Sequence, residues 1–164
     1  MELKRHLDLR YIFVGVYVLF FLIYIVLGLQ PAEAAVSYEV SANLSIPSIG
    51  LNSDVTSLSL RDGHLDTPDT IVGSFSRAKN KTLLIGHSTT VFEHLDSVQI
   101  GDEIVYNDRV YSVISREIQA KADISMARLL QAADNEMLVL MTCAGELLDG
   151  GDATHRLIIT AVEN

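Results

Sequence analysis

After its first forty residues the chain alternates between short apolar stretches and polar turns. The apolar stretches are rich in Val, Ile, Thr and Tyr and are bounded by turn-forming residues, which is typical of β-strands. Asn107 and Asp108 tolerate turn conformations, so the strands on either side of them are predicted to form a hairpin. In chain order the predicted strands are NLSI, SDVTSLSL, TIVGSFS, TLLIG, DEIVYN, RVYSVIS, MLVLMT and RLIITAV.

Two segments between these strands are predicted to be short helices. The first is TTVFEHLDSV, residues 89–98, and the second is ADISMARLLQAAD, residues 122–134, with Asp123 as its N-cap. The apolar side chains on one face of the second helix are Met126, Leu129, Leu130 and Ala133. About eight strands against two short helices predict a mainly β domain, a closed or nearly closed barrel.

The N-terminal part of the chain has a different pattern. Residues 11–29 contain no charge over 19 positions, which as a helix would be about 28 Å long, against a bilayer core of about 30 Å. Lys4, Arg5 and Arg10 precede this segment, and the next basic residue is Arg61. The positive-inside rule therefore predicts a single-pass anchor with a cytoplasmic N-terminus and an extracellular domain. The expected regions are a cytoplasmic tail 1–10, an anchor 11–29, a linker 30–41 and a folded domain 42–164.

Cleavage of the N-terminal segment is the alternative to an anchor. Ala32-Glu33-Ala34 has the small-any-small pattern of a signal-peptidase site, whereas the apolar run exceeds the usual 7 to 15 residues or so of a signal peptide and favours the anchor. After residue 36 there are nine Lys and Arg against eighteen Asp and Glu, which accounts for the whole net charge of −9. So acidic a surface argues against a nucleic-acid partner.

Cys143 is the only cysteine, and it is either a buried apolar residue or a nucleophile. Free cysteines are often buried, which favours the first interpretation. Its position favours the second, because MLVLMTC is a predicted strand that ends at the cysteine and opens into a Gly-rich and Asp-rich loop. A catalytic thiol also needs a proton acceptor and a donor for an oxyanion.

His87 and Arg156 are the candidates for those two functions. His87 follows the predicted strand TLLIG, and Arg156 begins the last predicted strand, so both stand where a strand meets a loop, as Cys143 does. Neighbouring strands could bring these three positions together. The other histidines are set aside: His6 precedes the anchor, His64 is in a polar turn, His94 is in a predicted helix, and His155 should face away from Arg156.

Several strings of the chain resemble, in order and spacing, the motifs of sortases, the membrane-anchored cysteine transpeptidases of bacterial surfaces. The cysteine follows the histidine by 56 positions, and the arginine follows the cysteine by 13. The resemblance covers nearly all of residues 43–162. The strings are IPSIGL, TLLIGH, LDSVQIGDEIVY, VLMTC and THRLIITA.

The resemblance implies an eight-stranded sortase-like β-barrel and three catalytic roles. Cys143 would attack a carbonyl of a Leu-Pro-any-Thr-Gly-like sorting signal and form a thioacyl enzyme. His87 would act as general acid and then as general base, and Arg156 would bind the substrate and stabilise the oxyanion. Thr142 and Ala144, on either side of the cysteine, are expected to contact the substrate.

The implied partners are surface proteins that carry a C-terminal sorting signal, an amine acceptor from a cell-wall precursor or a pilin subunit, and the membrane. No cofactor is expected. Some sortases bind calcium, but this sequence supports no particular set of ligands, and the subclass stays open.

Three alternatives are open at this point. Gly86-His87-Ser88 lacks the Gly-any-Ser-any-Gly elbow of serine hydrolases, which disfavours that class. A cysteine hydrolase would use the same residues as a transpeptidase and would release the acyl group to water. A tethered β-domain that binds cell-wall components without catalysis would keep Cys143 buried and unreactive.

Overall fold

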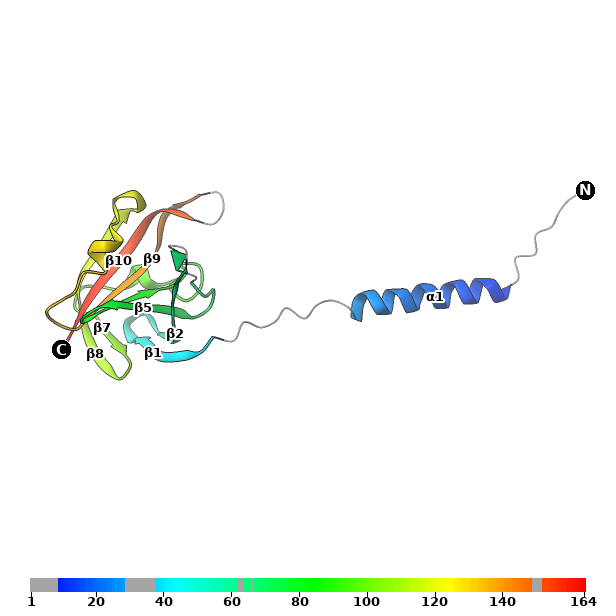
Figure 1. Cartoon of the computed structure of the whole chain (residues 1–164), viewed down its shortest axis with the longest axis horizontal. Coiled ribbons are helices and arrows are strands. Elements are labelled where there is room, and N and C mark those ends of the chain that lie inside the picture. The colour runs from blue at the N-terminus through cyan, green and yellow to red at the C-terminus, as the bar shows by residue number, and fades with distance from the viewer. Residues whose placement is uncertain (1–8, 29–37, 62–63, 66, 149–151) are drawn as a thin grey trace, which may run out of the picture. The chain divides into compact units, whose positions relative to one another are not determined.

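The structure, a computed structural model, describes residues 9–28, 38–61, 64–65, 67–148 and 152–164. The chain divides into two units, Met1–Ser37 and Tyr38–Asn164. The described part of the first unit is helix α1, Leu9–Gly28 (Figure 1).

Within the described residues, no helix combines the length and the apolar character needed to cross a membrane. The anchor over 11–29 therefore stays a prediction. Most of the expected tail and linker, and the candidate cleavage sequence 32–34, lie outside the described residues.

Eight strands of the second unit close into a barrel, as the sequence predicts (Figure 1). Around the barrel they follow the order β1-β2-β5-β6-β9-β10-β8-β7, and β7 pairs again with β1. The pairs β2–β5 and β6–β9 are parallel and the others are antiparallel. The eight strands are β1 Val40–Ile46, β2 Leu51–Ser57, β5 Val72–Ala78, β6 Lys81–Ile85, β7 Glu103–Tyr106, β8 Arg109–Ala120, β9 Met137–Leu147 and β10 Ala153–Glu163.

Strand β1 begins two residues inside the range expected for the linker. Two further strands, β3 Leu60–Arg61 and β4 His64–Leu65, pair with each other. The sequence predicts Leu60 as the end of the preceding strand, which in fact ends at Ser57, and His64 as part of a polar turn. The predicted β7–β8 hairpin is confirmed. Asn107 and Asp108 have φ angles of 50° and 63°, which is the left-handed geometry that a tight two-residue turn between twisted strands requires.

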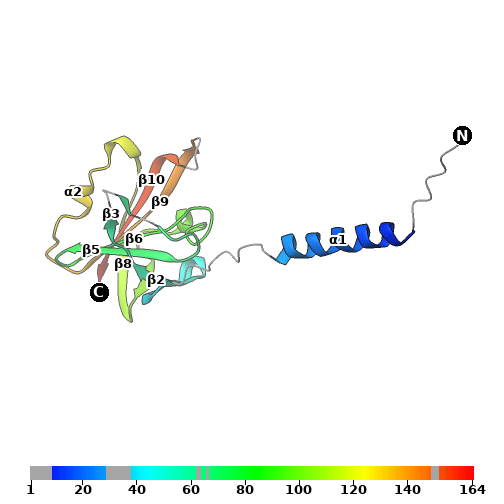
Figure 2. The ribbon, with the colours of Figure 1, turned by 45° about the vertical axis from the view of Figure 1, so that its right-hand side comes forward.

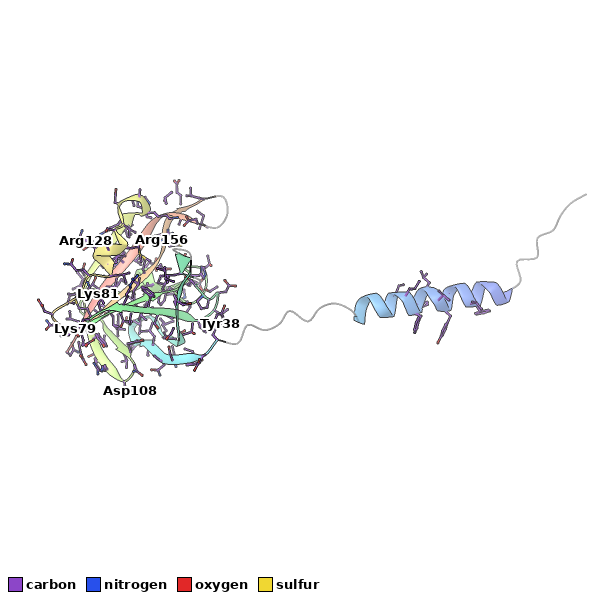
Figure 3. All side chains as sticks on the ribbon, viewed as in Figure 1. Tyr38, Lys79, Lys81, Asp108, Arg128 and Arg156 are labelled. Carbon is purple, nitrogen blue, oxygen red and sulfur yellow. The ribbon has the colours of Figure 1, made fainter. Side chains whose placement is uncertain are left out.

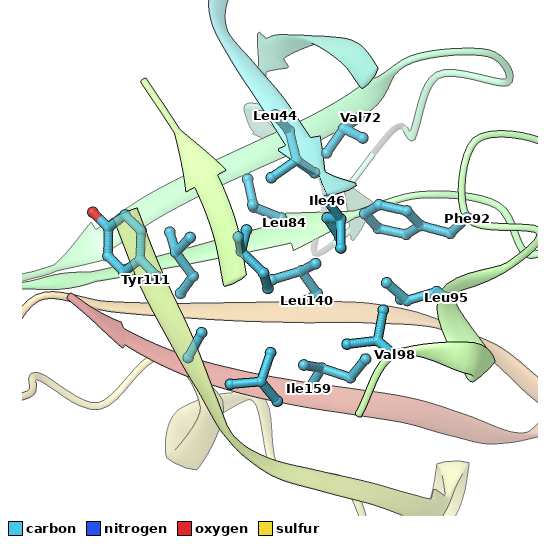
Figure 4. Packing of buried hydrophobic residues seen from close by; sticks show 14 of the residues in the cluster. Leu44, Ile46, Val72, Leu84, Phe92, Leu95, Val98, Tyr111, Leu140 and Ile159 are labelled. Carbon is cyan, nitrogen blue, oxygen red and sulfur yellow. The ribbon is translucent and has the colours of Figure 1, made fainter. Parts of the chain in front are cut away.

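The barrel interior is filled by the inward-facing residues of its strands and by a loop that follows β6 (Figure 4). Leu84, Leu140 and Ile159 are fully buried on three adjacent strands. Each such side chain contributes roughly 1.5–3 kcal/mol by leaving water. Because this core is made only of residues after Tyr38, the second unit has what it needs to fold by itself.

A second, smaller apolar cluster lies on the outer face of the same strands. Leu83, Val139 and Ile158 form its buried centre. These residues alternate with those that face the barrel interior, as successive strand residues must. The segment between β8 and β9 covers them with Ile124, Leu129 and Leu130, so both faces of β6, β9 and β10 are apolar in this region.

The helix predicted over 89–98 is shorter than expected and of another type. The chain forms turns followed by the 3₁₀ helix η2, Leu95–Ser97. Phe92, Leu95 and Val98 are all buried in the core. Their spacing of three residues matches the three residues per turn of a 3₁₀ path better than the 3.6 of an α-helix.

The helix predicted over 122–134 is also shorter than expected. It consists of the 3₁₀ helix η3, Lys121–Asp123, followed by α2, Met126–Leu129 (Figure 2). Ser125, not Asp123, caps α2 by accepting a hydrogen bond from the Arg128 amide. Beyond α2 the Ala133 amide donates to the Lys79 carbonyl at 3.2 Å. This bond ties the chain after α2 to the turn between β5 and β6.

Candidate active site

Cys143 lies on β9, and its thiol is free and partly buried. The prediction that the strand ends at this residue is wrong, because β9 continues to Leu147 and pairs there with Ala153 of β10. The two strands thus extend as a hairpin beyond the level of the cysteine. Cys143 keeps the alternation of β9 and faces outward with Val139 and Met141, which belong to the outer cluster.

Arg156 is the residue directly opposite Cys143 on the neighbouring strand β10. It does not begin this strand, as the sequence suggests, but is its fourth residue. Figure 3 labels Arg156 on β10. Cross-strand partners point to the same face of a sheet with their Cβ atoms about 5 Å apart, so the guanidinium and the thiol project from the same patch of the outer face.

Hydrogen bonds hold the Arg156 guanidinium, whose side chain is only 15% exposed. Nη1 donates to the carbonyls of Ala153 (3.0 Å) and His155 (2.9 Å), and Nη2 donates to Oδ1 of Asp152 at 2.6 Å. Oδ2 of Asp152 accepts from the Lys121 ammonium. The Lys121 ammonium, and after it the Arg156 guanidinium, hold the pKa of Asp152 well below its ordinary value of 3.8.

His87 reaches the same patch from β6, on the other side of β9. The parallel pairing of the two strands places Ile85 beside Met141, and the Gly86 amide still donates to the Met141 carbonyl at 3.4 Å. Continuing this register by two residues sets His87 beside Cys143. The strand β6 ends at Ile85, one residue before the predicted end, so His87 follows it after Gly86 and stands where the strand meets a loop.

Gly86 allows the histidine to occupy this place. A Cβ atom on Gly86 would lie 2.6 Å from Val91 Cγ1 and 2.7 Å from Phe92 Cδ2, both well inside van der Waals contact. Phe92 fills the end of the barrel core, and its amide donates to the His87 carbonyl at 3.0 Å. The absence of a side chain at position 86 therefore lets the loop after β6 close over the core while His87 turns outward.

The imidazole of His87 is 43% exposed and has two neighbours on the loop before β5. Nε2 lies 3.4 Å from the Thr67 carbonyl and 3.7 Å from Oδ1 of Asp69. The Asp69 side chain is almost fully exposed, so its ion pair with a protonated His87 is screened by water and is weak. The histidine is thus oriented while it stays open to solvent.

A cavity of about 700 Å³ connects these residues. Its size falls within the roughly 300–1,000 Å³ of pockets that bind small ligands. His87, Cys143 and Arg156 line it together with the polar side chains of Thr67, Arg77, Thr142 and Asp152. Apolar side chains from β3, β4, the barrel strands and residues 126–130 line the remainder. The α2 segment, β3 and the β9–β10 hairpin can be followed in Figure 2. The apolar lining consists of Leu60, Leu65, Phe75, Ile85, Met126, Ala127, Leu130 and Met141.

Thr142 and Ala144, predicted as substrate contacts, alternate with Cys143. Thr142 is 4% exposed, and its hydroxyl donates to the Gly86 carbonyl at 2.7 Å. This bond joins the strand that carries the cysteine to the residue before His87. Ala144 packs against the interior core. Substrate contact by either residue stays a prediction, although Thr142 does border the cavity.

Sequence reasoning did not single out Asp152. It lies in the segment read as a Gly-rich loop, of which residues 149–151 are outside the described residues. Its spacing of four residues from Arg156 carried no signal, because that relation indicates proximity on a helix and here arises at the start of a strand. Across the described ranges of the chain, no group of three or more His, Cys, Asp or Glu is placed to hold a metal ion.

Comparison with protein families matches residues 44–164 to the Sortase domain. None of the curated proteins compared matches the chain. Solved structures with the same fold include a lid mutant of sortase A from Corynebacterium diphtheriae (21% identity, TM-score 0.61, covering 83% of this chain and 75% of that one). A Clostridium perfringens sortase D5 transpeptidase has 22% identity and a TM-score of 0.59, with 77% and 79% covered. Sortase A from Listeria monocytogenes has 15% identity and a TM-score of 0.59, with 76% and 87% covered.

The family match spans well over half of the chain. The solved structures have the same fold, and at 15–22% sequence identity they support the fold alone. Both agree with the order of motifs in the sequence. The chain therefore belongs to the sortase family, whose members are cysteine transpeptidases.

Proposed function

We propose that this chain cleaves a Leu-Pro-any-Thr-Gly-like sorting signal and transfers its acyl part to an amine. One observation carries this proposal: Cys143 and Arg156 are cross-strand partners, and His87, two residues beyond the end of β6, lines the same cavity from the other side of β9. These three residues thus offer a nucleophile, a proton carrier and a cation to one cavity.

In the first half of the reaction, the Cys143 thiolate attacks the scissile carbonyl. The tetrahedral intermediate carries an oxyanion, and the Arg156 guanidinium, opposite Cys143 on the neighbouring strand, stabilises it. When the intermediate collapses, the C–N bond breaks and His87 gives a proton to the leaving amine. A thioester on Cys143 remains.

In the second half, an amine attacks the thioester and gives up a proton to His87. The C–S bond breaks, the thiolate is restored, and the acyl group leaves on the new amine. The acyl part must stay bound between the two halves, whereas the amines must exchange. The apolar lining suits the retained acyl part, and the exposed side of His87 suits the exchange.

The proposed partners are surface proteins with a C-terminal sorting signal and an amine of a cell-wall precursor or a pilin subunit. The proposed location is a cell membrane, with residues 11–29 as the anchor and the barrel outside. The uncharged sequence of that segment and the preceding basic residues support this orientation. The proposed steps use no metal or cofactor.

The test uses the barrel unit from Tyr38 with a panel of sorting-signal peptides. Mass spectrometry should detect a thioacyl adduct on the wild-type chain and none on Cys143→Ala. With a peptide and an added amine, the product should be the amide rather than the free acid. Formation of the acid alone at saturating amine would indicate a hydrolase, and full activity of His87→Ala or Arg156→Ala would refute the assigned roles.

A further inference from the structure

The Asp152 carboxylate binds two cations, Arg156 on β10 and Lys121 in the segment after β8. Asp152 accepts from Nη2 of Arg156 at 2.6 Å with one oxygen and from the Lys121 ammonium with the other. Lys121 begins η3, the 3₁₀ helix that leads from β8 to α2. Asp152 therefore bridges the start of β10 and the segment that forms one wall of the cavity.

The backbone around Asp152 fixes its position in turn. The Ala153 amide donates to Oδ1 at 2.8 Å, and the Leu148 amide donates to the Asp152 carbonyl at 2.7 Å. The second bond joins the residue after β9 to the residue before β10, and the first holds the carboxylate against the start of β10. The carboxylate is thus fixed by its own backbone as well as by the two cations.

The bonds of the guanidinium leave a defined set of donors for a substrate. Arg156 has five N–H groups, and the bonds to Ala153, His155 and Asp152 use three of them. Within the described part of the chain, the Nε proton and the second Nη2 proton have no bonded acceptor. A guanidinium is planar, so fixing its far edge also fixes the direction of these two donors.

We propose that Asp152 is the positioning residue of the active site: with Lys121 behind it, its carboxylate orients the Arg156 guanidinium so that two donors stay free for the oxyanion formed on Cys143. The inference rests on the proposed function. Asp152 acts through Arg156 and does not touch the reacting atoms. Without it the arginine stays charged but loses its fixed orientation, and a catalytic group displaced by about 1 Å can cost up to about a hundredfold in rate.

The test is a double-mutant cycle on the single-turnover rate of Cys143 acylation by a sorting peptide. Asp152→Ala should lower this rate about tenfold to a hundredfold in the wild-type background. In the Arg156→Ala background the same change should alter the rate less than about twofold, because there is no guanidinium left to orient. Lys121→Met should lower the rate only about two- to fivefold, as loss of an exposed ion pair does.

Glu146→Ala is the matched control, because it removes an exposed carboxylate from the same hairpin. It should leave the acylation rate unchanged. Circular dichroism melting shows whether each variant is folded, and Asp152→Asn, which keeps the size of the side chain, replaces Asp152→Ala if the latter unfolds. An equal loss of rate from Asp152→Ala in both backgrounds would overturn the inference, since the residue would then act independently of Arg156.

A crystal structure of the Asp152 variant gives a readout that needs no turnover. The Arg156 side chain should adopt another conformer or several, and an unmoved guanidinium would overturn the positioning role. If the wild-type chain forms no adduct, the proposed function fails, whereas the crystallographic comparison still decides the role of Asp152. If the wild type is active and Asp152→Ala is equally active, only the positioning inference fails.

Discussion

The hydrogen bond from the Thr142 hydroxyl to the Gly86 carbonyl offers a direct test of how the barrel aligns its active site. Thr142 precedes Cys143 on β9, and Gly86 precedes His87, so this 2.7 Å bond joins the residues next to the nucleophile and the base. Thr142→Val keeps the shape of the side chain and removes the donor. It leaves the Gly86 carbonyl without this partner in the barrel interior.

The loss of such a buried bond should destabilise the domain by about 1–3 kcal/mol, measured by urea unfolding. In addition, the acylation rate of the folded variant should fall about tenfold, because His87 is then free to move relative to Cys143. Thr56→Val is the matched control. Thr56, on β2, is also a buried threonine, and its hydroxyl donates to the carbonyl of Glu39, just before β1, at 2.9 Å; neither residue lines the cavity.

Thr56→Val should show a similar loss of stability without the loss of rate. If both variants lose stability equally and keep full activity, the bond supports the fold but does not align His87 with Cys143. If Thr142→Val loses no stability at all, the hydroxyl does not donate to Gly86, and this part of the reasoning is refuted.

Three further predictions concern the same residues. Gly86→Ala should destabilise the domain by about 1–3 kcal/mol in urea unfolding and lower the rate, because its Cβ would overlap Phe92; wild-type stability would show that the loop yields without strain. Arg156→Lys should lose about a hundredfold in acylation rate, because an ammonium cannot make the three bonds of the guanidinium and still offer two directed donors; near-wild-type activity would show that charge alone suffices. The folded-state pKa of Asp152 is lowered, so its contribution to stability is complete above its ordinary value of 3.8 and is lost as the pH falls below it. The difference in melting temperature between wild type and Asp152→Asn should accordingly be constant from about pH 5 to 8 and shrink below about pH 3.8, and a difference that grows on acidification would contradict the ion pairs.

The eight barrel strands could be predicted because their sequences combine β-branched residues with turn-forming ends. The β7–β8 hairpin shows this best, since Asn107 and Asp108 are among the residues that accept the positive φ angles found there. The lengths of β9 and β10 could not be predicted. The last three residues of β9, Gly145, Glu146 and Leu147, are exposed and have no alternating apolar pattern, and their pairing with β10 holds them in the strand.

The helices were harder to predict because tertiary contacts set their limits. The spacing of Phe92, Leu95 and Val98 fits a 3₁₀ path, but it also occurs within an α-helical pattern, so the sequence alone does not decide between them. After α2 ends at Leu129, the Ala133 amide bonds to the Lys79 carbonyl, which lies more than fifty residues earlier in the chain. The local sequence gives no sign of this contact.

The candidate site could be predicted at the level of its three main residues and not at the level of their supports. Three residues could be identified because each stands where a predicted strand meets a loop and belongs to a sortase-like string: His87, Cys143 and Arg156. Asp152 and Lys121 become relevant only when the β9–β10 hairpin and η3 are placed side by side. Their importance follows from geometry that the linear sequence does not show.

The most direct test of the account is the mass of the barrel unit after incubation with a sorting-signal peptide. The expected result is an added mass equal to the acyl part of the peptide, located on Cys143, removed by hydroxylamine or by an acceptor amine, and absent from Cys143→Ala. An adduct on another residue, or no adduct together with a thiol that reacts only after denaturation, would contradict it.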